Sequence, residues 1–307
     1  MALTLAITGG TGFVGGHAID KALAQGHQVR ALTRRPQPDR KGVTWVKGDL
    51  ANPQALQSLV SGADAVIHIA GVTNTRHKPE FDRGNVLGTA YLRRAAGPTP
   101  FLHISSLSAR EPQLSTYGLS KLRGEQVARG VQGPFAILRP PAVYGPGDEE
   151  YLALLRTAKS GLLPLPANAV TAMIYGPDLA AAIVALAEDL AGPATSNGGT
   201  FEIDDGAGGY TQSQVAEAIS NALGAKVRPI ELPSPVIGLA AGVDSMLCRL
   251  AGRTARLSRD RARYFAHPDW SANSDALLSL KLWKPSTDLQ HGMAKTAAWY
   301  REKGLLG

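Results

Sequence analysis

Cysteine is almost absent from this chain of 307 residues, which contains only Cys248. A single cysteine excludes an internal disulfide and any metal site built from a cysteine cluster, and it is compatible with a reducing compartment. No apolar run approaches the roughly 18 residues of a membrane-spanning helix. Residues 1–14 are apolar but have no basic stretch and no clear cleavage site, so we expect a buried strand there and no signal peptide.

Metal-binding histidine pairs are missing as well. The seven histidines are scattered without an H-x-x-x-H pair, so we expect no metal site. Lys and Arg number 32 against 25 Asp and Glu, a formal net charge of +7. This excess is compatible with an anionic ligand, nucleic acid or an anionic membrane surface. Because no nucleic-acid-binding module is recognisable, we expect a small-molecule partner and no nucleic acid.

Apolar residues are plentiful, at 44% against 19% charged residues, a composition typical of a globular protein. In the first half, short apolar runs alternate with segments of helical spacing. The runs predicted as strands are 3–8, 28–32, 43–46, 65–70, 101–105 and 135–138, and the predicted helices are 14–24, 53–60, 85–95 and 117–128. This alternation predicts an α/β fold with a doubly wound parallel sheet covered by helices on both faces.

The regular alternation weakens after about residue 147. Helices are predicted at 151–159, 177–190, 211–223, 233–250 and 289–303, with a short strand at 200–203. No repeat and no low-complexity linker separates the two halves. We therefore expect a nucleotide-binding domain over 1–147, completed by returning segments, and a smaller mixed α/β substrate cap with the C-terminal helices over 148–307.

A glycine-rich segment follows the first predicted strand. Residues 8–15 read T-G-G-T-G-F-V-G, which contains G-x-G-x-x-G through Gly10, Gly12 and Gly15 and a second glycine pattern through Gly9. Glycine lets the backbone approach a pyrophosphate closely, and the following helix directs free N–H groups at the anion. The position between a strand and a helix favours a dinucleotide site over an ordinary glycine turn.

The end of the second predicted strand distinguishes the two common dinucleotides. An acidic residue there would bind the ribose 2′-hydroxyl of NAD, whereas arginine accommodates the 2′-phosphate of NADP. This sequence has Arg34 and Arg35 and no acid before Asp39. Guanidinium groups bind phosphate through paired hydrogen bonds, so NADP(H) is preferred over NAD(H) here; two solvated surface arginines are the alternative.

Residues 115–121 contain Tyr-x-x-x-Lys at Tyr117 and Lys121. Positions i and i+4 share a helix face, and a nearby ammonium lowers the pKa of a phenol from about 10. Such a tyrosine can exchange a proton with an alcohol or ketone. The preceding strand ends in Ser105 and Ser106, with Ser108 close behind, and a serine there is placed to bind the reacting oxygen unless it only caps the next segment.

Together these features resemble the extended short-chain dehydrogenase/reductase family, also called the NAD-dependent epimerase/dehydratase family. The resemblance covers nearly the whole chain. Besides the two motifs above, it rests on G-D-L at 48–50, H-I-A-G at 68–71, N-V-L-G-T at 85–89, L-R-P-P-A-V-Y-G-P-G at 138–147 and W-K-P-S-T-D-L…W-Y-R-E-K-G at 283–304. It implies a Rossmann-type sheet with a cap.

The resemblance also implies roles for individual residues. Tyr117 would be the general acid/base, Lys121 would bind the nicotinamide ribose and tune Tyr117, and Ser106 matches the catalytic Ser/Thr position better than Ser105. The cofactor-binding positions implied by the family and by the sequence together are Gly9, Gly12, Phe13, Val14, Gly15, Arg34, Arg35, Asp49, Leu50, Ala70, Gly71, Ser105, Tyr117, Lys121, Pro140, Ala142 and Val143.

The family contains epimerases, dehydratases, ketoreductases and catalytically silent relatives. No Asp-Glu pair follows Ser106, which disfavours a dehydratase, and residues 167–178 lack the arginine or lysine that would hold a sugar diphosphate. The neighbouring apolar run 162–166 suits an apolar substrate. We therefore expect a reductase resembling 3β-hydroxysteroid dehydrogenases, dihydroflavonol reductases or ketoceramide reductases, with a nucleotide-sugar epimerase or a silent accessory protein as alternatives.

Residues 233–263 combine an apolar stripe with a basic stretch. The stripe comprises Val236, Leu239, Ala240, Val243, Met246, Leu247 and Leu250, and the arginines are Arg249, Arg253, Arg256, Arg259, Arg261 and Arg263. The stripe is typical of a cap core with solvated arginines, or of a helix lying on a membrane surface. The sequence predicts a cytoplasmic protein and leaves open both this peripheral membrane contact and a homodimer.

Overall fold

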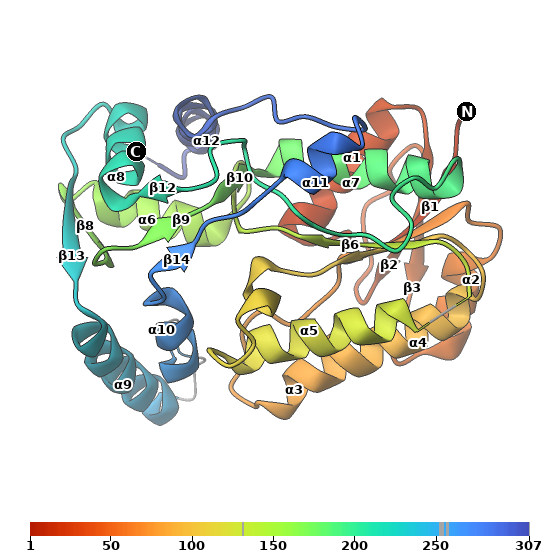
Figure 1. The fold of residues 1–307 in the computed structure, drawn as a ribbon, viewed down its shortest axis with the longest axis horizontal. Helices are drawn as coiled ribbons and strands as arrows, with labels where there is room; N and C mark the ends of the chain where they lie inside the picture. Colours follow the sequence, from red (N-terminus) through yellow and green to blue (C-terminus); the bar gives the residue numbers. More distant parts are fainter. Residues whose placement is uncertain (131, 252–254, 256–257, 307) are drawn as a thin grey trace. The chain divides into compact units, whose positions relative to one another are not determined.

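The computed structural model describes residues 1–130, 132–251, 255 and 258–306 (Figure 1). Contacts divide the chain into two compact units, each made of several segments. Unit 1 comprises Met1–Pro140, Leu179–Glu202 and Asp275–Lys284; unit 2 comprises Pro141–Asp178, Ile203–Ser274 and Pro285–Gly307. The functional division at residue 147 stays a prediction.

Unit 1 contains a sheet of seven strands in the order β11-β6-β5-β4-β1-β2-β3, and every neighbouring pair is parallel. Its strands are β1 (Thr4–Thr8), β2 (Gln28–Thr33), β3 (Val43–Lys47), β4 (Ala65–His68), β5 (Phe101–Ile104), β6 (Phe135–Arg139) and β11 (Thr200–Glu202). The chain order reverses between β1 and β4, and ligands bind at the carboxyl ends of strands beside such a reversal. The predicted α/β fold with a doubly wound parallel sheet is confirmed.

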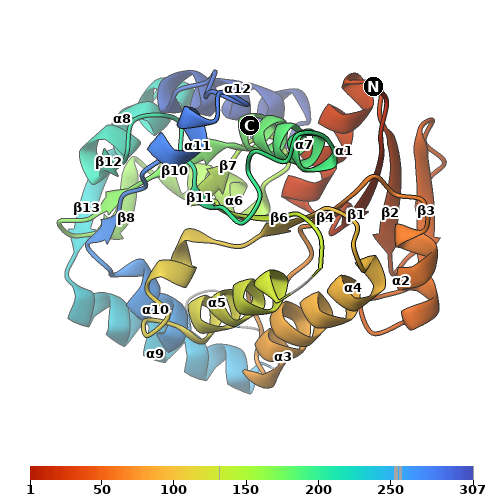
Figure 2. The ribbon, with the colours of Figure 1, turned by 45° about the vertical axis from the view of Figure 1, so that its right-hand side comes forward.

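Helices cover both faces of this sheet. Those of unit 1 are α1 (Phe13–Ala24), α2 (Pro53–Val60), α3 (Pro79–Asp82), α4 (Gly88–Ala96), α5 (Thr116–Arg129) and α11 (Asp275–Ser279), with a 3₁₀ turn η2 (Leu107–Arg110). Helix α7 (Gly176–Ala191) begins in unit 2 and continues in unit 1. Figures 1 and 2 show α4 and α5 on one face and α1 and α7 on the other.

A π-helical turn, η1 (Arg83–Leu87), precedes α4. The sequence predicted an α-helix from residue 85 to 95, so the prediction is wrong for its first turn. A π turn adds one residue to the local repeat, which apolar spacing does not reveal, and such turns often occur at functional sites.

Unit 2 has short strands and its own core. Its elements are β7 (Ala142–Tyr144), α6 (Glu149–Ala158), β8 (Leu162–Pro166), β9 (Val170–Thr171), β10 (Met173–Tyr175), β12 (Tyr210–Thr211), α8 (Gln212–Leu223), β13 (Arg228–Leu232), α9 (Ser234–Leu250), α10 (Arg259–Phe265), β14 (Asp269–Trp270) and α12 (Leu289–Glu302). Helix α8 packs against α12. In β8, Leu163 and Leu165 are buried in the core, so packing within unit 2 accounts for two of the three leucines in the apolar run that we interpreted as suiting an apolar substrate.

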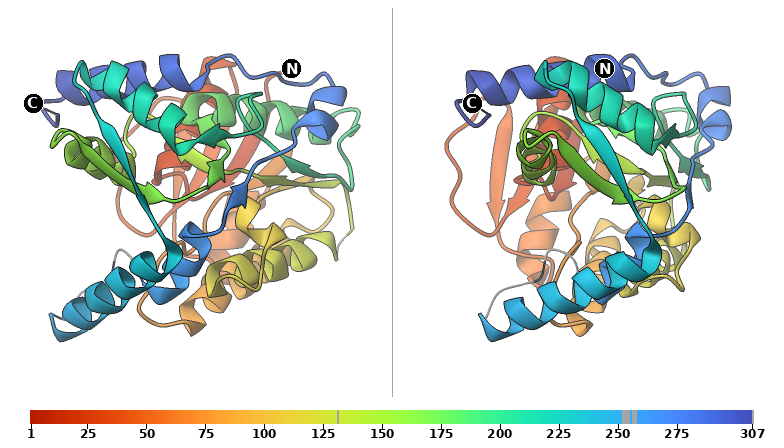
Figure 3. Two further views of the ribbon diagram at one scale, coloured as in Figure 1. Left: turned by 60° about the vertical axis from the view of Figure 1, so that its left-hand side comes forward. Right: turned by 90° about the vertical axis from the view of Figure 1, so that its left-hand side faces the viewer.

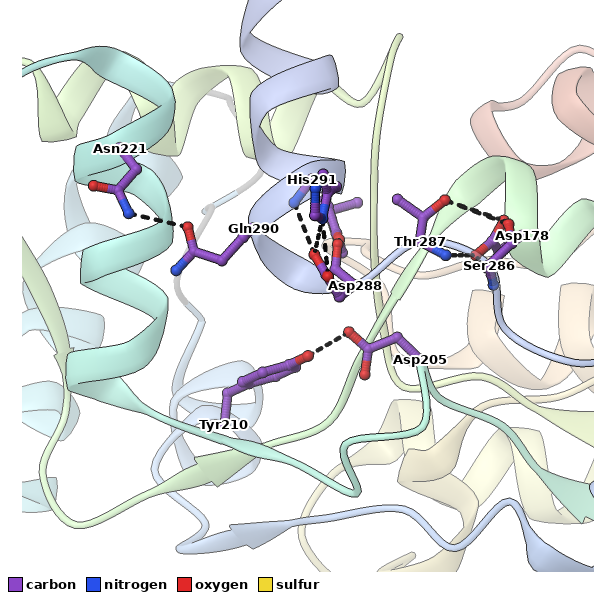
Figure 4. A network of polar contacts seen from close by, with 10 residues as sticks. Asp178, Asp205, Tyr210, Asn221, Ser286, Thr287, Asp288, Gln290 and His291 are labelled. Atoms are coloured by element: carbon purple, nitrogen blue, oxygen red, sulfur yellow. Dashed lines mark hydrogen bonds and ion pairs between the residues drawn. The ribbon is translucent and has the colours of Figure 1, made fainter.

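Carboxylates fix the start of α12. Asp178 accepts hydrogen bonds from the backbone N–H groups of Ser286 (2.9 Å) and Thr287 (2.8 Å) and from the Ser286 hydroxyl (2.7 Å). Asp288 then caps α12 by accepting the N–H of His291 at 2.9 Å. Figure 4 shows these contacts in a row along the segment that leads into the helix.

Helix α9 packs along α10 (Figure 3). Ile237 and Ala241 are buried there against Ala262. The predicted stripe is mostly exposed, because Val236, Leu239, Val243, Met246 and Leu247 face solvent. The interpretation of the stripe as cap core is therefore wrong for these five residues.

Part of the predicted basic stretch lies outside the described residues. Arg253 and Arg256 are among the residues that the structure leaves undescribed, and the side chains of Arg249, Leu250 and Arg259 are also undescribed. Among the helices that are described, none is both long and apolar enough to cross a membrane.

Candidate active site

The loop between β1 and α1 requires glycine at two positions. Gly9 has φ +77°, and a Cβ there would lie 2.7 Å from the backbone nitrogen of Ala70. A Cβ at Gly15 would lie 2.0 Å from the carbonyl oxygen of Gly9. The loop therefore folds tightly back on the start of α1. Gly12 is the N-cap of this helix and no side chain caps it, so the helix start suits an anion such as a dinucleotide pyrophosphate.

The residues predicted near the adenosine end lie at the ends of β2 and β3. Arg34 and Arg35 follow β2 directly and are both exposed, and Asp49 beyond β3 is exposed as well. The Thr33 hydroxyl donates to the carbonyl of Arg35 at 2.6 Å, which turns the chain at this point. Leu50 is half-buried, and a Cβ on Gly88 would meet its side chain at 2.7 Å.

A buried histidine connects β1 and β4 to the π turn. The Thr89 hydroxyl donates to the carbonyl of Asn85 at 2.8 Å, so its oxygen accepts from His68 Nε2 at 2.9 Å. His68 Nδ1 then accepts the Thr8 hydroxyl at 2.7 Å, and Thr8 Oγ1 accepts the N–H of Ala70 at 3.3 Å. Burial lowers the pKa of His68 to about 3, with a further contribution from Lys121. His68 is therefore neutral and holds these strand ends together.

Asn85 joins the segment after β4 to α5. Its side chain bonds both backbone groups of Val72, accepting from N at 2.7 Å and donating to O at 2.9 Å. It also donates to the Ser120 hydroxyl at 2.9 Å. A Cβ on Gly71 would lie 3.0 Å from Asn85 Oδ1 and 3.8 Å from Lys121 Nζ. The backbone at Gly71 thus passes directly beside both side chains.

Tyr117 lies in the first turn of α5, which is capped by Ser115. The Ser115 hydroxyl accepts the N–H of Gly118 at 2.9 Å. A Cβ on Gly118 would lie 2.6 Å from the carbonyl oxygen of Ser108, so this turn packs closely on η2. The Tyr117 side chain is half-buried, with its ring centroid 6.1 Å from that of Phe81.

Lys121 is buried one turn further along α5. Its Nζ donates to the carbonyl of Ile104, the last residue of β5, at 2.7 Å. Burial lowers the pKa of Lys121 to about 8, and the charge of Glu125 opposes this shift. Lys121 is therefore mainly an ammonium at neutral pH, and this charge lies at the sheet edge that precedes Ser106.

The three serines after β5 have different partners. The Ser105 hydroxyl donates to Glu125 Oε1 at 2.6 Å. Ser106 Oγ instead accepts, from the N–H of Ser108 at 3.2 Å and from its hydroxyl at 3.0 Å. Because both of these bonds use its lone pairs, the proton of Ser106 is left for another acceptor. This arrangement favours Ser106 over Ser105 and Ser108 as a donor to a substrate oxygen.

The structure therefore brings most of the predicted residues to one edge of the unit 1 sheet. Lys121 and Ser106 lie where β5 ends, Tyr117 lies in the first turn of α5, which packs on η2 just beyond, and Ala70 and Gly71 lie where β4 ends. Pro140 adjoins this edge because its carbonyl accepts the N–H of Leu107 at 2.8 Å. Two predicted residues, Ala142 and Val143, belong to β7 of unit 2.

Two residues of this cluster were not singled out from the sequence. Asn85 was part of a recognised motif, but its contacts with the residues around Lys121 follow from the π turn. Glu125 accepts from Ser105 and makes paired bonds of 2.7 Å with Arg139. A lone Glu on a helix carries no signal of burial. The spacing of Glu125, four residues after Lys121, places the two side chains on the same face of the helix, and this spacing is what the sequence indicates about their proximity.

Chemically, this edge combines a phenol, an ammonium and an uncommitted hydroxyl. A phenol beside a buried ammonium can give or take a proton near neutral pH. The glycine loop beside it fits the phosphates of a dinucleotide. This combination suits the proton transfer that accompanies hydride transfer to or from a carbonyl carbon.

Comparisons with known proteins agree with this chemistry. Residues 5–199 match the model of the NAD dependent epimerase/dehydratase family. The chain is 38% identical to a ceramide reductase of Caulobacter vibrioides over 98% of this chain and 96% of that protein. It is 28% identical to a 2-alkyl-3-oxoalkanoate reductase of Stenotrophomonas maltophilia over 53% of this chain and 58% of the relative.

A solved structure of MoeE5 in complex with UDP-glucose and NAD shares the fold. It superposes with a TM-score of 0.76 at 21% identity and covers 98% of this chain and 99% of that one. The seven-stranded parallel sheet, the matching family model and the full-length relative lead to one assignment. The chain belongs to the NAD dependent epimerase/dehydratase family, as an NAD(P)-dependent oxidoreductase of the extended short-chain dehydrogenase/reductase type.

Proposed function

We propose that this protein is an NADP(H)-dependent ketoreductase that acts on a hydrophobic, lipid-like ketone or the corresponding alcohol. The proposal rests on the predicted roles of Tyr117, Lys121 and Ser106, and the observation that supports it is the buried Lys121, whose Nζ lies 2.7 Å from the Ile104 carbonyl at the end of β5. The full-length similarity to a ceramide reductase supports the substrate class. In this proposal the bound dinucleotide supplies or accepts the hydride.

In this proposal, residues of the chain would transfer the proton and position the substrate oxygen. Tyr117 gives its phenolic proton to the oxygen during reduction and takes it back during oxidation. The Lys121 ammonium stabilises the phenolate form of Tyr117. The Ser106 hydroxyl donates a hydrogen bond to the same oxygen and holds it in place. Unit 1 would bind the dinucleotide, and residues 148–307 would supply the substrate cap.

The cofactor preference is a separate part of the proposal. Arg34 and Arg35 are exposed at the end of β2, where they are placed to bind a 2′-phosphate. Replacing both with alanine should weaken NADPH binding about tenfold or more while changing NADH binding less than about twofold. Calorimetric titration with each cofactor measures this, and equal losses for both would contradict the NADP(H) preference.

The activity is tested by following NADPH and NADH oxidation with a panel of ketones and nucleotide sugars. Oxidation driven by hydrophobic ketones supports the proposal. Interconversion of sugars without net cofactor oxidation would identify an epimerase instead. Cofactor binding without either reaction would leave a silent accessory protein.

The partners and location follow from the substrate class. We propose a hydrophobic small-molecule substrate and a cytoplasmic protein that contacts a membrane surface through residues 233–263. A homodimer remains a prediction, which sedimentation velocity tests.

A further inference from the structure

The outer side of α9 is an apolar surface without charge. It is formed by Val236 (47% exposed), Leu239 (73%), Val243 (52%), Met246 (65%) and Leu247 (59%), here called the α9 apolar face. At about 100° per residue these five side chains fall within an arc of about 100°. Scattered apolar residues on a surface are ordinary, but a contiguous patch of large ones marks a site of association.

The α9 apolar face is separate from the side of α9 that stabilises unit 2. Ile237 and Ala241 point to the other side, where they are buried with Ala262 of α10. Figure 3 shows α9 leaving the end of β13, with α10 along one side of it. The packing of α9 on its own unit thus leaves the five large side chains between 47% and 73% exposed.

The charge near this face identifies the kind of partner. In the sequence, residues 249–263 contain six arginines and one acidic residue, Asp260. Of the described ones, Arg263 is exposed and Arg261 pairs with Glu150 at 3.1 Å. An apolar helix face that is followed in the sequence by a basic stretch matches an anionic lipid surface. A second copy of the chain fits less well, because it carries the same net charge of +7 and not an opposite one.

We propose that the α9 apolar face docks on the surface of an anionic lipid bilayer. The 17-residue helix would lie in the plane of the interface, with Leu239 and Met246 entering the acyl boundary. The choice of a bilayer rests on the proposed function, since a lipid-like substrate would be collected there. Arginine side chains would reach the phosphate groups of the lipids.

Vesicle flotation tests this proposal with the full chain. Vesicles of phosphatidylcholine with about 30% phosphatidylglycerol should carry the protein, whereas pure phosphatidylcholine vesicles should carry much less of it. Raising NaCl from about 0.1 M to about 1 M should weaken the binding, because the Debye length falls. The double variant Leu239→Gln/Met246→Gln should lower the partition at least about tenfold.

A matched control removes an exposed leucine from another part of unit 2. Leu305, which follows α12, is 40% exposed, and Leu305→Gln should bind the vesicles as the wild type does. Both variants should unfold at the wild-type temperature and oxidise NADPH with a water-soluble ketone at the wild-type rate. Undiminished vesicle binding by the double variant would overturn the proposal.

Two further outcomes separate the docking surface from the proposed function. Failure to reduce any ketone, together with vesicle binding that the double variant loses, would support the docking surface while the proposed function falls. A dimer that the double variant dissociates, without any vesicle binding, would overturn the proposal and assign the face to a second copy.

Discussion

At the carboxyl ends of β4 and β5, unit 1 buries polar side chains; along α9, unit 2 exposes apolar ones. Lys121, Glu125, Asn85 and His68 are all buried, although burying a polar group without a partner costs free energy. Each of them has hydrogen-bond partners at ordinary distances. The five side chains of the α9 apolar face are instead exposed to water, which is unfavourable for apolar groups, and no described residue of unit 2 covers them fully.

The contrast separates two kinds of functional surface. In unit 1 these four buried side chains have hydrogen-bond partners within the unit, whereas both nitrogens of the neighbouring His103 have none among the described residues. In unit 2 the α9 apolar face stays exposed to water, so only a binding partner outside this unit would bury it. Substitutions in the first region should therefore change chemistry and stability, and substitutions on the α9 apolar face should change only association.

The largest effect is expected at Tyr117. Tyr117→Phe removes the proton donor and keeps the ring, so kcat should fall about 10²–10⁴-fold while the NADPH dissociation constant changes less than about twofold. Steady-state kinetics and calorimetric titration measure the two quantities. Turnover at the wild-type level would contradict the role of Tyr117.

Replacing Glu125 tests whether the buried polar groups of unit 1 depend on their hydrogen-bond partners for stability. Glu125→Leu leaves Arg139 without its paired carboxylate and Ser105 without an acceptor, so the free energy of unfolding should fall by about 3–5 kcal/mol. The exposed pair of Arg123 and Asp82, 3.0 Å apart, provides the control. Asp82→Asn should cost less than about 1 kcal/mol in the same urea titration, and equal losses would refute the distinction.

Lys121 makes a prediction about pH. Its pKa is lowered from 10.5 to about 8 by burial, so between these values the unfolded chain binds the proton and the folded chain does not. The free energy of unfolding should therefore gain a contribution of about 3 kcal/mol as pH rises from 8 to 10.5. Lys121→Met should lack this contribution. Parallel pH profiles for the two proteins would show that the ammonium is not buried at neutral pH.

The smallest effect compares two adjacent histidines. The rings of His68 and His103 lie 5.3 Å apart, but neither nitrogen of His103 has a hydrogen-bond partner among the described residues. His103→Leu should therefore raise the free energy of unfolding by up to about 1 kcal/mol, whereas His68→Leu should lower it by about 2 kcal/mol.

The two histidine variants also differ from the wild type at low pH. Burial lowers the pKa of His103, so the wild-type chain loses stability as pH falls below 6.5, when the unfolded histidine takes up a proton. Without this histidine the loss should be smaller. Urea titrations at pH 7 and pH 5 measure both effects, and a destabilised His103→Leu protein would contradict the comparison.

The sequence predicted the elements of unit 1 closely because buried parallel strands and amphipathic helices have clear patterns. The helix 53–60 was predicted with the limits of α2, and the strand 28–32 falls one residue short of β2. The π turn at Arg83–Leu87 was missed, and so was the pairing of β8 with β13. These depend on contacts between distant segments, which local patterns do not encode.

The site was predictable to a similar extent. Tyr117, Lys121 and Ser106 were predicted from their spacing and from the resemblance to a family, and their catalytic roles stay predictions. The roles of Glu125 and His68 were not, because their hydrogen bonds join residues from different strands and helices. The exposure of Leu239 and Met246 was left open, since an apolar stripe has the same pattern whether it faces a core or a membrane.

The division of the chain into interleaved segments limits how the two units can be exchanged during evolution. The backbone passes from one unit to the other after Pro140, Asp178, Glu202, Ser274 and Lys284. Neither unit is therefore encoded by one uninterrupted stretch of gene, and a single recombination event cannot exchange one of them intact between relatives. Each unit therefore has to change by point substitution or by short insertions, while the interleaved segments of the other unit are kept.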